Sequence, residues 1–253
     1  IYSNSLKFNY LRILKLRSHF KQIKPIVIIG FIITNNILLI LASLGLKTST
    51  IIAERSDLFT NKISKIYFKL RRLTYCFSDL LVFQTEFAFR LGYNNNIRAK
   101  KNTIIPNPIE INYSTLIRKE NIILYVGRLS KEKQVKGLIS AFNRISNKQF
   151  KLWIVGDGEE RFELEKYAKS ISSKDRITFF GNQQNVNEFY SLSKIFVLPS
   201  SSEGFPNVLL EAMNFNNLII CSRYSEAASE IIQDNKNGFL YESGNINDLT
   251  KLL

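Results

Sequence analysis

Two cations and a glycine follow an apolar run near the middle of the sequence. The segment begins with Val126-Gly127-Arg128 and continues to Lys133. A glycine lets the backbone approach a ligand closely, a guanidinium binds phosphate oxygens in pairs, and an ammonium acts as a point charge. Arg128 and Lys133 therefore suggest a grip on a diphosphate, although a charged loop before a helix is also an ordinary surface feature.

A second polar segment, residues 200–213, holds two carboxylates. Glu203 lies in the expected loop, and Glu211 lies more than a turn inside the helix expected after it. Pro206 suits the first turn of that helix, and Gly204 leaves room at the helix start, where backbone N–H groups face an anion. Two carboxylates beside a cation pair suit a polyhydroxylated anion. Either glutamate alone would be interpreted as a cap or a surface acid.

Apolar runs at intervals of about 20 to 30 residues must position these loops. They cover residues 122–126, 152–155, 177–180, 195–198, 218–221 and 238–241. A helical segment follows each run, and this alternation predicts an α/β doubly wound parallel sheet. Ligands of such sheets bind at the carboxyl ends of the strands, so function is expected in these loops.

The first half shows a similar but less complete alternation. We expect a strand over residues 26–32, a helix capped near Thr34 or Asn35 and ending at Gly45, and a strand over residues 50–53. Together they predict a parallel βαβ unit. Further elements are expected over residues 62–75, 80–83, 86–91 and 103–105.

Residues 26–46 also have the length of a membrane-spanning helix. Two asparagines in the middle of the stretch make a strand followed by a helix the better interpretation.

A polar stretch later interrupts the alternation and divides the chain. We expect an incomplete N-terminal domain over residues 1–110, a linker over 111–120 and a C-terminal nucleotide-sugar-binding domain over 121–253.

The composition limits the class of protein. The 253 residues are 45% hydrophobic, which excludes a disordered chain and leaves room for two ordinary domains. Cys76 and Cys221 form neither a zinc motif nor a redox pair and favour a reducing, cytoplasmic setting. The chain begins at Ile1 rather than Met, so we expect a fragment, and no signal-peptide pattern follows, so we expect no signal peptide in it.

The formal charge of +14 is concentrated in the first half. Residues 1–100 carry 16 Lys and Arg against 4 Asp and Glu, and residues 101–253 carry 19 against 17. This imbalance indicates nucleic acid, an anionic membrane surface, an anionic substrate or a solvated basic face. No nucleic-acid motif interleaves the basic residues with aromatic ones, so we expect no nucleic acid partner. The basic residues proposed to face lipid are Lys7, Arg12, Lys15, Arg17, Lys21, Lys24, Lys62, Lys65, Lys69, Arg71 and Arg72.

Five motifs in order resemble the retaining glycosyltransferases of family 4. They are Gly127-Arg128-Leu129 with Glu132-Lys133, Val155-Gly156-Asp157-Gly158 with Glu160, Phe180-Gly181, Leu198-Pro199-Ser200, and Glu203-Gly204-Phe205-Pro206 through Leu210-Glu211-Ala212-Met213, the E-x7-E signature. The family has the GT-B fold, two doubly wound Rossmann-like domains facing a cleft, and uses nucleotide-sugar donors. The resemblance covers roughly residues 24–253. It is weaker in the first half, where Glu54-Arg55 and the segment up to Asn107-Pro108 carry it.

The resemblance implies a role for each matching residue. Arg128 and Lys133 would bind the donor diphosphate and stabilise the charge that develops as the glycosyl bond breaks. Glu203 would contact the donor sugar, and Glu211 would hold the ribose hydroxyls. The remaining donor-binding residues would be Gly127, Gly204, Phe205, Pro206, Asn207 and Val208 beside the sugar and phosphate, and Gly181 and Asn182 beside the nucleobase.

The family's chemistry implies retention, because the acceptor hydroxyl enters on the face that the nucleotide leaves. No Asp-x-Asp metal clamp is present in the sequence, so neither a metal nor another cofactor is expected. The expected enzyme is a hexosyl- or N-acetylhexosaminyltransferase for surface polysaccharide or lipopolysaccharide. It would use a nucleotide sugar, preferably a UDP-sugar, and a lipid-linked or oligosaccharide acceptor, and would lie peripherally at the inner face of the cytoplasmic membrane.

Two alternatives stay open. One is a truncated or degenerate module that binds nucleotide or membrane without catalysis. The other is a nicotinamide-dependent dehydrogenase, which lacks support because no G-x-G-x-x-G follows a strand near a domain start.

The sequence also departs from the family pattern. Asn216 stands near the family's helix-ending glycine and is expected to take its left-handed conformation. Residues 225–230 replace a glycine-rich turn. The family's opening strand with its glycine-rich acceptor loop and its closing helix are expected to be missing from this fragment. His19 precedes a strand and is not expected to be catalytic, whereas Arg55 is better placed for a role in the cleft.

Overall fold

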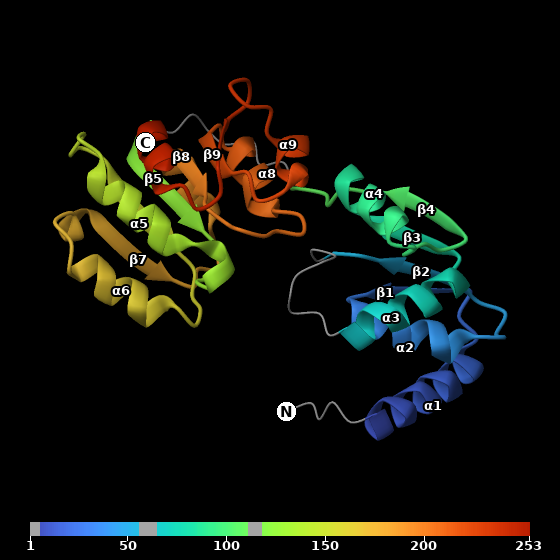
Figure 1. Ribbon diagram of the computed structural model, residues 1–253. Helices are drawn as coiled ribbons and strands as arrows, with labels where there is room; N and C mark the ends of the chain where they lie inside the picture. Colours follow the sequence, from blue (N-terminus) through green and yellow to red (C-terminus); the bar gives the residue numbers. More distant parts are fainter. Residues whose placement is uncertain (1–5, 56–64, 111–117) are drawn as a thin grey trace. The chain divides into compact units, whose positions relative to one another are not determined.

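The computed structural model describes residues 6–55, 65–110 and 118–253 (Figure 1). The chain divides into two compact units, Ile1–Asn107 and Pro108–Leu253. The division falls three residues before the expected end of the first domain. Residues 111–117 of the expected linker lie outside the described residues, and the first strand of the second unit begins at the linker's last position, Glu120.

The first unit contains a four-stranded parallel sheet in the order β1-β2-β3-β4. Its strands are β1 (Val27–Phe31), β2 (Ser49–Ala53), β3 (Leu80–Phe83) and β4 (Lys101–Ile104). Its helices are α1 (Leu6–Ile23), α2 (Ile33–Ser43), α3 (Lys65–Thr74) and α4 (Glu86–Asn94), with a 3-10 turn at Tyr75–Phe77. The expected parallel βαβ unit is confirmed, since β1 pairs with β2 in parallel. Residues 62–64 of the expected third helix lie outside the described part.

Helix α2 begins earlier than expected. Ile32 precedes it in a left-handed conformation with φ of 73°, and no side chain caps the helix start. The expected cap at Thr34 or Asn35 is therefore wrong. Asn36, in the first turn, is buried and donates to the Ala53 carbonyl at 3.2 Å. The helix ends at Ser43, two residues before Gly45.

Helix α1 was not expected from the sequence. It packs against α2, and the Arg17 guanidinium donates to the carbonyls of Ala42 and Leu44 at 3.1 and 2.6 Å. These two carbonyls lie at the C-terminal end of α2, where a cation also complements the helix dipole. Within residues 6–55, 65–110 and 118–253, every helix is too short or too polar to cross a bilayer. The stretch considered as a membrane span forms β1 and α2 instead.

The second unit is a six-stranded parallel sheet in the order β10-β9-β8-β5-β6-β7. Its strands are β5 (Glu120–Val126), β6 (Lys151–Val155), β7 (Ile177–Gly181), β8 (Ser193–Leu198), β9 (Leu218–Ser222) and β10 (Phe239–Tyr241). Its helices are α5 (Val135–Arg144), α6 (Arg161–Lys169), α7 (Asn187–Leu192), α8 (Asn207–Asn214), α9 (Glu226–Ile231) and α10 (Ile246–Leu252), with 3-10 turns at Lys131–Lys133 and Lys174–Arg176. All six expected strands are present.

Two hydrophobic cores cover the two faces of this sheet. Along β5, Ile123 and Tyr125 face one core, and Leu124 and Val126 face the other, because successive strand residues point to opposite faces. Residues of α5, α6 and α10 fill the first core, and residues of α7, α8 and α9 fill the second. Burial on both faces explains why the strands are continuous apolar runs.

The strand order decides which loops meet. Strand β5 pairs with both β6 and β8 although β8 starts more than seventy positions after β5 begins. The loops that follow Val126, Val155 and Leu198 are therefore neighbours at the carboxyl edge of the sheet. These are three of the loops in which the sequence analysis placed the motifs of glycine, cations and carboxylates.

Candidate functional site

Backbone hydrogen bonds join the ends of β5, β6 and β7. The Gly127 N–H donates to the Val155 carbonyl at 3.0 Å, and the Gly156 N–H donates to the Gly181 carbonyl at 2.8 Å. A Cβ on Gly156 would lie 1.9 Å from the Gly127 carbonyl oxygen, and its φ is 130°. Only glycine fits at this position, and the joined backbone of these three strand ends is called the backbone floor below.

Gly127, Arg128 and Asn182 line one hollow of about 340 Å³ at this floor. Its other lining residues are Val126, Val155, Gly156, Asp157, Gln183 and Val186. Arg128 and Asn182 are exposed. The structure thus brings together three of the residues that the sequence assigned to the donor.

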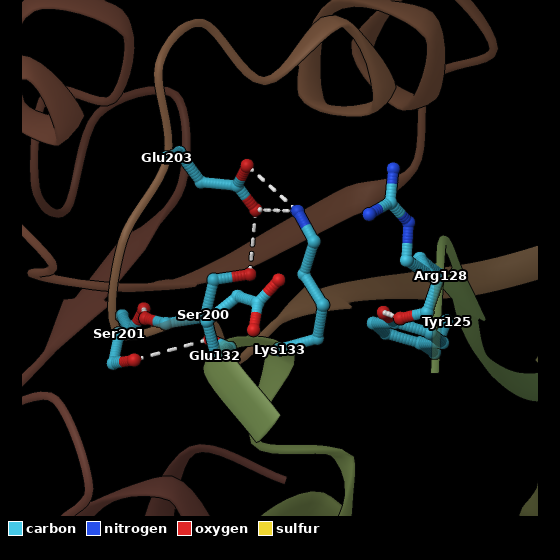
Figure 2. A network of polar contacts seen from close by, with 8 residues as sticks. Tyr125, Arg128, Glu132, Lys133, Ser200, Ser201 and Glu203 are labelled. Atoms are coloured by element: carbon cyan, nitrogen blue, oxygen red, sulfur yellow. Dashed lines mark hydrogen bonds and ion pairs between the residues drawn. The ribbon is translucent and has the colours of Figure 1, made fainter. Parts of the chain in front are cut away.

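The loop of residues 127–134 between β5 and α5, called the cationic loop below, ends in an unusual conformation. The 3-10 turn Lys131–Lys133 is followed by Gln134, which is left-handed with φ of 49° and precedes α5. A non-glycine residue pays of order 1 kcal/mol for this conformation. The turn directs the Lys133 side chain away from α5, and in Figure 2 the side chains of Lys133 and Arg128 extend in the same direction.

Lys133 and Glu203 form an ion pair between the loops after β5 and β8. The Lys133 Nζ lies 2.7 Å from Glu203 Oε1 and 2.8 Å from Oε2 (Figure 2). The side chains are 22% and 10% exposed. The sequence placed both residues in the site, and the structure joins them directly.

Serines that the sequence analysis did not assign to the site hold this pair. The Ser200 hydroxyl donates to Glu203 Oε1 at 2.6 Å and is itself completely buried. The Ser201 N–H and hydroxyl both donate to the Glu132 carbonyl, at 2.7 and 3.1 Å (Figure 2). These contacts fix the two loops to each other. The position of Ser200 directly after an apolar strand was the signal that would have found it.

Tyr125 of β5 forms a hydrogen bond to the backbone of the cationic loop. Its hydroxyl donates to the Arg128 carbonyl at 2.8 Å. Burial, and then the negative charges of Glu203 and Glu132, raise the pKa of the Tyr125 phenol well above its usual range. Tyr125 therefore keeps its proton and remains a hydrogen-bond donor to the loop.

The segment after Glu203 forms the start of α8. Pro206 was expected in the first turn of the helix but lies immediately before it, and its side chain is buried. Asn207 and Val208 are the first two helical residues, while Gly204 and Phe205 lie in the preceding loop. The N–H of Asn207 donates to the Phe205 carbonyl at 3.1 Å, so a tight turn forms the helix entry.

Glu211 lies on α8 and contacts Tyr190 of α7. The Tyr190 hydroxyl donates to Glu211 Oε2 at 2.9 Å. The Tyr190 ring is buried and stacks on Phe215 at 5.8 Å between centroids. Burial, and then the charge of Glu211, raise the pKa of Tyr190 far above its usual range. A protonated tyrosine thus orients one carboxylate oxygen, a contact that sequence reasoning missed.

Other expectations also have outcomes. Asn216 is left-handed with φ of 55°, as predicted for the position of a missing glycine. Residues 225–230 start α9, which Ser225 caps by accepting from the Ala227 N–H. His19 is exposed on α1. Across the described ranges, no three His, Cys, Asp or Glu side chains come together as metal ligands.

A larger hollow of about 420 Å³ lies elsewhere in this unit. It is lined by residues of α5 and of the start of α10, with Tyr241 and Pro199. None of the predicted site residues lines it. We place the candidate site at the smaller hollow, because the ends of β5 and β6 meet there with the side chains of Arg128 and Asp157. Its lining does not include the predicted site residues Lys133, Gly181, Glu203 and Glu211.

Known proteins resemble this chain in sequence and in fold. Residues 109–253 match the model of the family described as glycosyl transferases group 1. The chain is 35% identical, over 232 residues, to a Campylobacter jejuni protein named GalNAc-alpha-(1->4)-GalNAc-alpha-(1->3)-diNAcBac-PP-undecaprenol alpha-1,4-N-acetyl-D-galactosaminyltransferase. This alignment covers 89% of the chain and 63% of that relative.

Two further proteins are similar over different lengths. The lipopolysaccharide 1,6-galactosyltransferase of Escherichia coli is 31% identical over 63% of the chain and 47% of its own length. The solved structure of HepE from Anabaena in complex with UDP superposes with a TM-score of 0.85 and 19% identity, covering 94% of the chain and 70% of HepE. The chain thus spans less than two thirds of both curated relatives.

Proposed function

Because the chain belongs to the group 1 glycosyl transferases, we propose that it transfers a sugar from a nucleotide-sugar donor to a glycan acceptor in cell-surface glycan biosynthesis. Its two parallel sheets have the GT-B fold expected from the sequence. The observation that carries the proposal is the meeting of Arg128, Lys133 and Glu203 at the carboxyl ends of β5 and β8.

The second unit binds the donor. Arg128 and Lys133 hold the diphosphate, since their side chains extend in one direction beside a backbone floor that admits close approach. The nucleobase lies in the hollow by Asn182 and Gly181, and Glu211 accepts the ribose hydroxyls. Glu203 and residues 204–208 line the sugar. The Tyr190 contact supports the role of Glu211, because it leaves the carboxylate oriented and still partly exposed.

The chemical step depends on charge at the leaving group. As the glycosyl bond breaks, the diphosphate gains negative charge, and the two cations of the loop stabilise it. The pairing with Glu203 holds the Lys133 side chain at the strand ends, where the proposed diphosphate lies. The transfer retains the anomeric configuration, as in family 4, and needs no metal or other cofactor.

The donor is a UDP-sugar, and the acceptor is lipid-linked or a polysaccharide. The structure of HepE contains UDP, and the name of the Campylobacter relative specifies an undecaprenol diphosphate acceptor. Both features are properties of those proteins, and they support the same classes here. The enzyme works peripherally at the inner face of the cytoplasmic membrane, which is supported by the exposed basic residues of α1.

Calorimetric titration with UDP and with GDP, without divalent metal, tests the donor site. We expect micromolar binding of UDP to the full chain, and its loss in Arg128→Ala and Glu211→Ala. Arg144→Ala is the matched control, because Arg144 is an exposed arginine at the end of α5 that bonds to Asn247. Binding of neither nucleotide by the folded protein would favour a non-catalytic module instead.

A further inference from the structure

The first unit has its own polar cluster at the carboxyl ends of its four strands. Arg55 follows β2, Gln84 follows β3, and Asn107 lies beyond β4. The Arg55 Nη2 donates to Asn107 Oδ1 at 2.9 Å, and the Gln84 amide donates to the same oxygen. The Arg55 guanidinium also lies over the ring of Phe31, the last residue of β1, at 5.5 Å. One exposed arginine is thus held between β1 and β4.

A buried network lies beside this cluster. Glu54, next to Arg55, is 3% exposed and accepts from the Tyr75 hydroxyl at 2.6 Å. Arg71 is completely buried, and its Nη1 lies 3.7 Å from Glu54 Oε1. Asn36 donates to the Tyr75 hydroxyl at 3.2 Å. The network corrects the sequence analysis, because Arg71 was expected to face lipid.

The network has a consequence for the charge of the cluster. Burial raises the pKa of the Glu54 carboxyl, while the charge of Arg71 and the Tyr75 hydroxyl lower it. Whether Glu54 is ionised against Arg71 or protonated, the pair carries no net negative charge. Nothing in this pair offsets the charge of Arg55, which is therefore available to an anion from solution.

We propose that Arg55, held by Asn107 and Phe31, binds a phosphate-type oxyanion carried by the acceptor, at the carboxyl ends of the first sheet. A guanidinium matches two phosphate oxygens at once, and one fixed by an amide and an aromatic ring loses little freedom on binding. Ligands of open parallel sheets bind at this edge. Assigning the oxyanion to the acceptor rests on the proposed function, but the binding site itself does not.

Apolar residues stand at the same strand ends. Phe31 ends β1 and is 46% exposed, Ile32 follows it and is 63% exposed, and Ile105 follows β4 and is 55% exposed. A phosphate on a prenyl chain would contact both Arg55 and this apolar surface, whereas a soluble phosphate would contact Arg55 alone. The two sources share the oxyanion and differ in the apolar contribution.

The test uses inorganic diphosphate and the full chain carrying Arg128→Ala and Lys133→Ala, which removes the two cations proposed to hold the donor diphosphate. Calorimetry is expected to show binding that Arg55→Gln weakens at least tenfold and Arg55→Lys weakens less. Arg98→Gln is the matched control, since Arg98 is also exposed, lies over a ring (Tyr93, 4.9 Å) and donates to an asparagine, Asn96. We expect it to change the affinity less than twofold.

Equal effects of Arg55→Gln and Arg98→Gln would overturn the proposal, as would the absence of diphosphate binding before Arg55 is changed. Unchanged urea midpoints would show that the variants fold. Geranyl diphosphate distinguishes the source: tighter Arg55-dependent binding than inorganic diphosphate identifies a prenyl-linked phosphate, and equal affinity identifies a soluble one. UDP titration with Arg128 and Lys133 intact is separate, because its failure would remove the proposed donor site and leave this result standing.

Discussion

The Tyr190 hydroxyl donates to Glu211 Oε2 over 2.9 Å and joins α7 to α8 beside the second core. Since Tyr190 stays protonated, the contact persists at all physiological pH values. We expect Tyr190→Phe to weaken UDP binding about three- to tenfold, because one hydrogen bond to a charged group contributes about 1.5–3 kcal/mol at most and Glu211 remains present. Calorimetry measures the effect. An unchanged affinity would show that Glu211 needs no orientation.

The Lys133 ammonium is expected to act mainly in the transition state. Lys133→Ala should lower kcat roughly 10²–10³-fold, as for the loss of one preorganised donor at a developing charge. Lys136→Ala, one turn further on exposed α5 surface, is the control. Steady-state kinetics with the full chain and a UDP-sugar provides the measurement. Turnover like that of the unsubstituted protein would mean that the diphosphate is held elsewhere.

The left-handed Gln134 predicts a stabilising substitution. Gln134→Gly removes a backbone cost of about 1–2 kcal/mol and adds about 0.5–1 kcal/mol of chain entropy in the unfolded state, so a net gain of about 0.5–1 kcal/mol is expected. Trp153 is the sole tryptophan of the sequence and lies in β6, so its fluorescence during urea unfolding reports on the second unit. Gln134→Ala should bring no gain, and equal midpoints for the two variants would contradict the prediction.

The stability of the first unit is expected to depend on pH through Asp79. Hydrogen bonds from Lys100 and then from the Thr50 N–H lower the pKa of its carboxyl. A lowered pKa contributes stability above the ordinary value of 3.8, and this contribution is lost as the pH falls through the folded value. Asp79→Asn should therefore flatten the pH dependence of Thr50 amide protection below about pH 5. The same slope in both proteins would exclude the effect.

Membrane attachment is expected to depend on the exposed lysines of α1 and of the residue that follows it. Lys15, Lys21 and Lys24 are exposed, and together they should contribute about 1 kcal/mol each at an anionic surface. Replacing all three by alanine should reduce sedimentation with phosphatidylglycerol vesicles and leave the weak binding to neutral vesicles unchanged. High salt should have the same effect.

The control removes an equal charge from the second unit. Lys166, Lys169 and Lys174 are also exposed, and their replacement by alanine should leave vesicle binding intact. Equal binding of the full chain to neutral and anionic vesicles would refute an electrostatic attachment.

Local pattern was sufficient for the strands of the second unit. Runs such as residues 195–198 are short and apolar, and each coincides with an observed strand, although the run 238–241 begins one residue before β10. The left-handed Asn216 was predictable for the same reason, because few residues tolerate that conformation. The motifs also placed Arg128 and Lys133 correctly at a strand end, since spacing along the chain fixes that relation.

Relations between distant segments were not predictable. The hydrogen bonds of Asn36 with Ala53 and Tyr75 depend on how α2 packs, so no local pattern indicates that this asparagine is buried. Likewise, Arg71 lies in a segment with a basic, amphipathic pattern, but its side chain is buried beside Glu54. The Lys133–Glu203 pair depends on β5 lying beside β8, an order that no local pattern specifies.

The ion pair between Lys133 and Glu203 also bears on how fast nucleotide leaves the enzyme. In the proposed donor site, Lys133 exchanges Glu203 for the diphosphate when the nucleotide binds. The Lys133 ammonium pairs with Glu203 again when the product leaves. If the proposed donor site is correct, we expect Glu203 to compete with the product diphosphate for Lys133 and so keep product affinity moderate, which matters where release limits turnover. Glu203→Gln should consequently slow UDP dissociation, even though it impairs contact with the sugar.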